Sequence, residues 1–154
     1  MRRGERQAQL APTPGMRVPR VARTAALTHQ EIQGTIAKLA PYYGMEAMQE
    51  YRGDIGTYDV VWRRVAAGQP AKVFEIQHRG NLDSAFVKLK HAYDMWNARL
   101  FLVTTSVADS RKAYQLLASS FHEMRPYLTI VPGWDLSDFA QAKARFGDLD
   151  GALK

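Results

Sequence analysis

Two strand-forming runs that each contain a carboxylate constrain this sequence most. Residues 58–63 read YDVVWR and residues 72–77 read KVFEIQ, and both are rich in the β-branched and aromatic residues that favour strands. The connection between them contains Gly and Pro, so the segment predicts a β-hairpin. Asp59 and Glu75 lie within these apolar runs. A buried carboxylate without a partner costs several kcal/mol, so each needs a specific partner in the folded chain.

The rest of the chain alternates helical and strand patterns. A Thr-x-x-Glu capping box at Thr28 predicts the start of a first helix, which Pro41 and Gly44 end. Further elements are predicted from periodicity and turn residues: strands at 45–51, 99–105 and 127–131, and helices at 82–97, from Ser106, and at 135–146 with Gly147 as its end. The order of helix, three strands, helix, strand, helix, strand and helix predicts an α/β fold, a three-layer sandwich with a mixed central sheet.

Length and composition predict one intracellular domain. The chain has 154 residues and no cysteine, which excludes a disulfide framework, a thiolate zinc site and a cysteine nucleophile. Its apolar runs are far shorter than the ~20 residues of a membrane span, so we expect no membrane partner. We assign residues 25–154 to a single domain and expect a cytoplasmic or nucleoid-associated location.

Most of the positive charge lies at the N-terminus. Residues 1–23 contain six arginines against one glutamate and include three prolines, and this composition predicts a disordered basic arm over residues 1–24. Arg17, Arg20 and Arg23 are candidates for binding nucleic-acid phosphates. A weak organelle-targeting peptide, a start upstream of the true initiator Met16, and a plain solvated tail are the alternatives.

The hairpin carboxylates suggest a metal site. Residues two apart share one face of a strand, so Glu75 and Gln77 project together, and pairing of the two strands brings Asp59 to the same patch. Two carboxylates, the main-chain carbonyl of Ile76 and several waters would suit Mg²⁺, or Mn²⁺ as its substitute. Such an ion activates water and neutralises charge on a phosphate. Phosphodiester hydrolysis is the chemistry that this set of ligands predicts.

These residues carry a resemblance to a known superfamily. A helix with an acidic residue, a short strand, Asp59 in YDVVW, a turn and then Glu75-Ile76-Gln77 resemble the PD-(D/E)xK nucleases of restriction-endonuclease-like fold, over residues 28–131. The resemblance implies that Asp59 and Glu75 hold Mg²⁺. Gln77 stands where that superfamily has a lysine, which departs from the pattern because an amide carries no positive charge.

The resemblance also suggests where the missing cation and other groups lie. Some members take the cation from the next helix, where Lys88 and Lys90 are the candidates, and we prefer Lys88. Glu31 on the first helix is a further candidate ligand, although helix capping alone explains it. Arg79 and Lys90 are candidates for contacts with DNA.

Each functional interpretation has a structural alternative. Asp59 could pair with Arg63 or Arg64, and Glu75 could form a cross-strand ion pair. A catalytically inactive module of the same fold, binding nucleic acid or a protein, and an RNA-processing nuclease are the other functional hypotheses. The chain is short, so cleavage of DNA by a structure-selective or nonspecific endonuclease suits it best. Specific base readout would need a homodimer or a larger repair or restriction complex.

Overall fold

A five-stranded mixed sheet forms the centre of the protein, with strand order β1-β2-β3-β4-β5. The computed structural model describes residues 27–78 and 80–154. Strands β1, β2 and β3 pair antiparallel, whereas β3, β4 and β5 pair parallel. The strands span Glu46–Arg52 (β1), Thr57–Arg63 (β2), Pro70–Gln77 (β3), Arg99–Thr104 (β4) and Leu128–Pro132 (β5).

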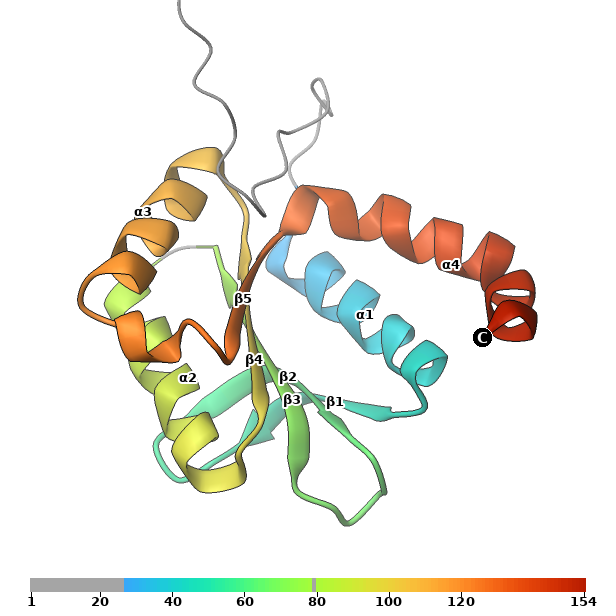
Figure 1. The fold of residues 1–154 in the computed structure, drawn as a ribbon, viewed down its shortest axis with the longest axis horizontal. Coiled ribbons are helices and arrows are strands. Elements are labelled where there is room, and N and C mark those ends of the chain that lie inside the picture. The colour runs from blue at the N-terminus through green and yellow to red at the C-terminus, as the bar shows by residue number, and fades with distance from the viewer. Residues whose placement is uncertain (1–26, 79) are drawn as a thin grey trace, which may run out of the picture.

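Helices cover both faces of this sheet (Figure 1). They span His29–Leu39 (α1), Leu82–Trp96 (α2), Val107–Ala118 (α3) and Gly133–Leu153 (α4), with short 3₁₀ turns at Ala40–Tyr43 (η1) and His122–Met124 (η2). Helices α2 and α3 lie on one face, and α1 and α4 lie on the other. The predicted α/β sandwich is therefore confirmed at the level of a mixed sheet between helical layers.

Strand alternation divides the buried side chains into two cores. The core under α2 and α3 includes Val73, Phe86 and Leu100, whereas the core under α1 contains Phe74 and Ile76. Successive residues of β3 thus serve opposite faces, as the pleat of a strand requires.

The local signals that start and end the first helix act as predicted. The Thr28 hydroxyl accepts a hydrogen bond from the Glu31 amide at 3.1 Å, and the Glu31 carboxylate accepts one from the Thr28 amide at 3.4 Å. Helix α1 ends at Leu39, the 3₁₀ turn follows, and Gly44 adopts a left-handed φ of 67°.

The prediction that Gly147 ends the last helix is wrong. Helix α4 continues to Leu153, and Gly147 is absent from the glycines with positive φ among the described residues. A Cβ at Gly147 would stand 2.9 Å from the Tyr42 ring. Gly147 therefore permits close packing of α4 against Tyr42 and does not terminate the helix.

No helix in the described part of the chain combines the length and apolar composition that crossing a membrane requires.

Adjacent residues of α2 provide a test of this core. Phe86 is fully buried, whereas Val87 is 54% exposed. We expect Phe86→Ala to lower the free energy of unfolding by about 3–5 kcal/mol through the cavity it leaves, and Val87→Ala to change it by less than about 0.5 kcal/mol. Urea denaturation of both variants measures the difference, and similar losses would contradict the assigned orientation of α2.

Candidate functional site

Asp59 and Glu75 lie where β2 and β3 stop pairing. The pairing runs to Val60 opposite Phe74, although β2 begins two residues before Asp59 and β3 continues beyond Glu75. Past this point side-chain oxygens receive main-chain hydrogen bonds. The Asp59 amide donates to Glu75 Oε1 at 3.2 Å, and the Ile76 amide donates to Asp59 Oδ2 at 2.7 Å. The two carboxylates thus occupy a gap between the strands and are joined through main-chain amides.

Lys88 of helix α2 contacts the second of these carboxylates. Its Nζ lies 3.0 Å from Glu75 Oε2 and also donates to the Thr57 carbonyl at 2.5 Å. The Tyr58 hydroxyl donates to the Lys88 carbonyl at 3.2 Å, and the Lys88 ammonium lies 5.4 Å from the centre of the Tyr58 ring. The structure therefore brings the preferred lysine to Glu75, while its role in catalysis stays a prediction.

Burial and neighbouring negative charges raise the pKa values of two groups beside Lys88. Burial, and secondly the Asp59 carboxylate, raise the pKa of Glu75 to about 7, although Lys88 acts in the opposite direction. Burial and then the charges of Glu75 and Asp54 raise the pKa of Tyr58 to about 12. Burial is the largest cause of both shifts, and the neighbouring negative charges, which a further positive charge would offset, are the second.

Side chains from α1 orient Asp59. Asp59 Oδ1 lies 3.1 Å from His29 Nε2, and the Gln33 amide donates to the Asp59 carbonyl at 2.9 Å and to Glu50 Oε1 at 2.6 Å. Glu50 has a φ of 52°, a conformation that costs energy in a non-glycine residue. With the Glu75 and Ile76 contacts described above, four residues thus hydrogen-bond to the main chain or carboxylate of Asp59.

Sequence reasoning missed His29, Gln33 and Glu50. Glu50 lies in a different strand, and His29 and Gln33 reach Asp59 through the packing of α1 on the sheet. No local motif marks such contacts. Gln33 offered the one usable signal, because a polar residue that directly follows Ile32 and precedes Ile36 by three positions lies close to the buried stripe.

Three predicted residues lie in the described part of the chain but make other contacts. The Glu31 carboxylate caps α1 at Thr28, and the Gln77 amide donates to the Gly80 carbonyl at 3.0 Å. Lys90 pairs with Asp94 on the exposed side of α2 at 2.8 Å. The other predicted nucleic-acid-binding residues lie outside the described residues: Arg17, Arg20, Arg23 and Arg79.

The oxygen atoms in the gap are suited to a hydrated Mg²⁺. Each carboxylate oxygen of Asp59 and Glu75 has one assigned hydrogen-bond contact, and a carboxylate has about four lone-pair sites. The Ile76 amide points toward Asp59, so the Ile76 carbonyl faces the same edge of β3. No group of three or more His, Cys, Asp or Glu suited to a metal occurs among the described residues, so water would complete the coordination, as Mg²⁺ prefers.

Comparison with known proteins gives no match to any protein-family model, curated protein or solved structure.

The pKa of Glu75 should respond to its two neighbours in opposite directions. Asp59→Asn removes a negative charge and should lower the pKa of Glu75 from about 7, whereas Lys88→Met removes a positive charge and should raise it. Titration of the ¹³C-labelled glutamate carboxyl by NMR between pH 4 and 9 gives these values. A pKa of Glu75 that is the same in both variants would show that the charges do not interact.

The same pKa predicts a loss of stability with rising pH. The folded-state pKa of Glu75, about 7, exceeds its ordinary value of 4.5, so the folded state binds the proton more tightly. The stabilising effect of that proton is fully present below pH 4.5 and is lost as the pH rises to about 7, by a free energy of the order of 3 kcal/mol. Chemical denaturation at several pH values should show this decline in the parent protein and lack it in Glu75→Gln.

Proposed function

We propose that this protein is a Mg²⁺-dependent nuclease that hydrolyses phosphodiester bonds in DNA. The observation that carries the proposal is the convergence of Asp59, Glu75 and Lys88 at the point where β2 and β3 separate. Two carboxylates with an excess of negative charge would hold a hard divalent cation, and a neighbouring ammonium group supplies the positive charge that phosphate chemistry needs.

We also propose membership of the PD-(D/E)xK superfamily, with a restriction-endonuclease-like fold. The support is the order of elements: α1, an antiparallel β1-β2-β3 unit, then α2 and the parallel strand β4. Asp59 lies on β2 and Glu75 on β3, as the resemblance implies. In this proposal Lys88 of α2 takes the place of the superfamily lysine that Gln77 replaces.

The roles of the residues follow from their contacts. Asp59, Glu75 and the Ile76 carbonyl would hold the Mg²⁺, which supplies Lewis-acid help and lowers the pKa of a bound water. The His29 and Gln33 contacts keep Asp59 in one orientation. The Lys88 ammonium, 26% exposed and adjacent to Glu75, would hold the attacking water or a phosphate oxygen by a charge-assisted hydrogen bond.

A second candidate function has its own support. The Gln77 amide donates to the Gly80 carbonyl, and Lys88 is already paired with Glu75. A buried ion pair of this kind also occurs as a purely structural feature. The alternative is therefore a catalytically inactive module of the same fold that binds nucleic acid or a protein partner without a metal.

Variants of the three central residues test the nuclease proposal. With Mn²⁺ or Mg²⁺ and a panel of single-stranded, duplex and branched DNA, we expect Lys88→Met to lower the cleavage rate by about 10²–10³-fold through loss of charge stabilisation. Asp59→Asn and Glu75→Gln should abolish both cleavage and Mn²⁺ binding, measured by calorimetry. Lys112→Met, which removes an exposed lysine of α3, is the matched control and should cleave normally.

The outcomes separate the candidate functions. Metal-dependent cleavage that is lost in Glu75→Gln supports the nuclease, and cleavage of an RNA panel alone would reassign the substrate. No Mn²⁺ binding and no cleavage in the parent protein, with DNA binding retained, would favour the inactive module.

A further inference from the structure

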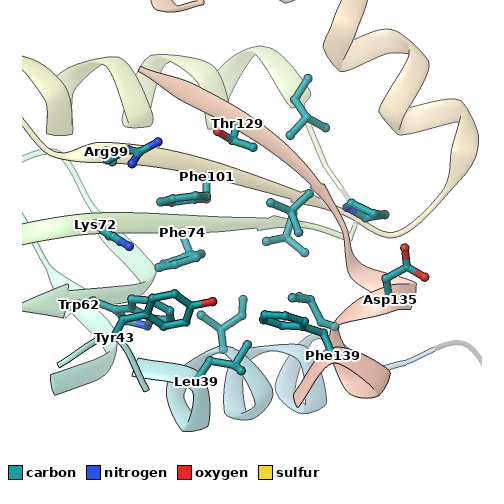
Figure 2. A pocket seen from close by; sticks show the side chains of 16 residues that line it. Leu39, Tyr43, Trp62, Lys72, Phe74, Arg99, Phe101, Thr129, Asp135 and Phe139 are labelled. Atoms are coloured by element: carbon teal, nitrogen blue, oxygen red, sulfur yellow. The ribbon is translucent and has the colours of Figure 1, made fainter. Parts of the chain in front are cut away.

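A groove of 470 Å³ lies on the face of the sheet opposite Glu75 (Figure 2). The sheet from β2 to β5 forms its floor, and α1 and α4 form its side. Phe74 lines the groove, whereas the next residue, Glu75, contacts α2 on the other face. The groove is therefore separate from the candidate catalytic site.

Aromatic rings make up much of the groove. The ring centroids of Phe74 and Phe101 lie 4.6 Å apart in a stacked arrangement, and those of Trp62 and Phe74 lie 4.7 Å apart. Tyr43, which is 40% exposed, stacks on Trp62 at 5.4 Å. Trp62 Nε1 is buried and has no hydrogen-bond partner among the described residues. Trp62 and Phe74 are only 4% and 7% exposed, so the accessible rings of the groove are those of Tyr43 and Phe139, which are 40% and 41% exposed.

Two cations stand side by side at one end of the groove. Lys72 of β3 and Arg99 of β4 are register partners, and within the described residues neither forms an ion pair with a carboxylate. Burial, and then the charges of Arg99 and Arg64, lower the pKa of Lys72. Like charges on directly opposite strand positions destabilise a sheet. An anion bound between Lys72 and Arg99 would remove this repulsion.

We infer that this groove binds a single-stranded nucleic-acid segment, with a phosphate on Lys72 and Arg99 and a base stacked against the exposed rings of Tyr43 and Phe139. Base stacking on aromatic side chains beside a basic path is the general way in which proteins hold single strands. Asp135 lies at the other end of the groove (Figure 2), and its carboxylate repels phosphate and so favours one orientation. Residues 1–26 are not the expected occupant of the groove. They contain six arginines against one glutamate, and this positive charge would be repelled by Lys72 and Arg99.

The inference does not depend on the proposed nuclease. Lys72 precedes Glu75 by three positions on β3, about 10 Å along the strand, and the two residues face opposite sides of the sheet. Binding in the groove requires no metal ion, so it can be measured in EDTA, where metal-dependent cleavage is absent.

The test is the binding of fluorescein-labelled (dT)₈ by fluorescence polarisation in EDTA at low salt. We expect Lys72→Gln and Arg99→Gln each to weaken binding by about 5–10-fold through loss of a phosphate contact. Tyr43→Leu should weaken it by about 5-fold or more through loss of stacking. Lys112→Gln, which removes the same charge from α3 on the opposite face, is the matched control and should bind within about 2-fold of the parent protein.

Two further measurements keep the result decisive. Lys72→Gln relieves the repulsion with Arg99 but also removes the contacts of the Lys72 ammonium with the Tyr43 and Trp62 rings, at 5.0 and 5.3 Å from their centres. Thermal unfolding of each variant is therefore measured first, and binding is compared at a temperature at which all variants are folded, so that weaker binding cannot be attributed to unfolding. An octaglutamate peptide is the competitor: displacement of (dT)₈ by equimolar peptide would identify an acidic peptide as the occupant and overturn the inference. Equal binding of (dT)₈ by the parent, Lys72→Gln and Tyr43→Leu proteins would also overturn it.

Discussion

The position of two neighbouring carboxylates between β2 and β3, one buried and one partly buried, is the constraint on which the candidate site depends. Continued pairing of these strands would place Asp59 directly opposite Glu75, with the two carboxylates side by side, but the pairing ends at Val60 opposite Phe74. The cost of separating the strands is partly offset because the carboxylates accept the hydrogen bonds of the Asp59 and Ile76 amides. Burial, and secondly the Asp59 carboxylate, still raise the pKa of Glu75 although Lys88 lowers it.

The sheet is also irregular on the other side of Asp59, where β2 pairs with β1. The pairing of β1 with β2 joins Gln49 to Val60 and Tyr51 to Tyr58 and omits Glu50 and Asp59 between them. Glu50 has a positive φ, and its carboxylate accepts a hydrogen bond from Gln33. Strained backbone of this kind persists only when surrounding contacts over-determine it. Here Gln33 bridges Glu50 and the Asp59 carbonyl, so α1, β1 and β2 together determine the position of one carboxylate.

The order of elements could be predicted from the sequence because it depends on local patterns. The capping box at Thr28 and the apolar runs of the hairpin act over a few residues, and the structure has them where they were expected. Gly147 was misread because glycine serves both helix ends and close packing, and only the position of Tyr42 distinguishes the two. The missed residues His29 and Gln33 depend on how α1 lies on the sheet, which no short motif encodes.

Which of Lys88 and Lys90 contacts Glu75 could not be predicted from a local pattern either. At about 100° per residue, these lysines lie on opposite flanks of the buried stripe formed by Leu82, Phe86 and Leu89. Periodicity therefore assigns both to the border of the core and does not say which flank faces β2. The direction of α2 across the sheet decides which lysine faces β2: Lys88 reaches Glu75, and Lys90 pairs with Asp94.

The alternation of side chains along β3, in contrast, could be predicted from the sequence. It separates two electrostatic environments on opposite faces of this strand. Glu75 lies beside Asp59 and Lys88, where the proposed function requires a metal ion. Lys72 faces a region with excess positive charge, which attracts a polyanion without one. A protein with both sites would retain a nucleic-acid strand on one face of its sheet while the opposite face depends on a divalent cation, so binding and cleavage would respond differently to metal and to salt.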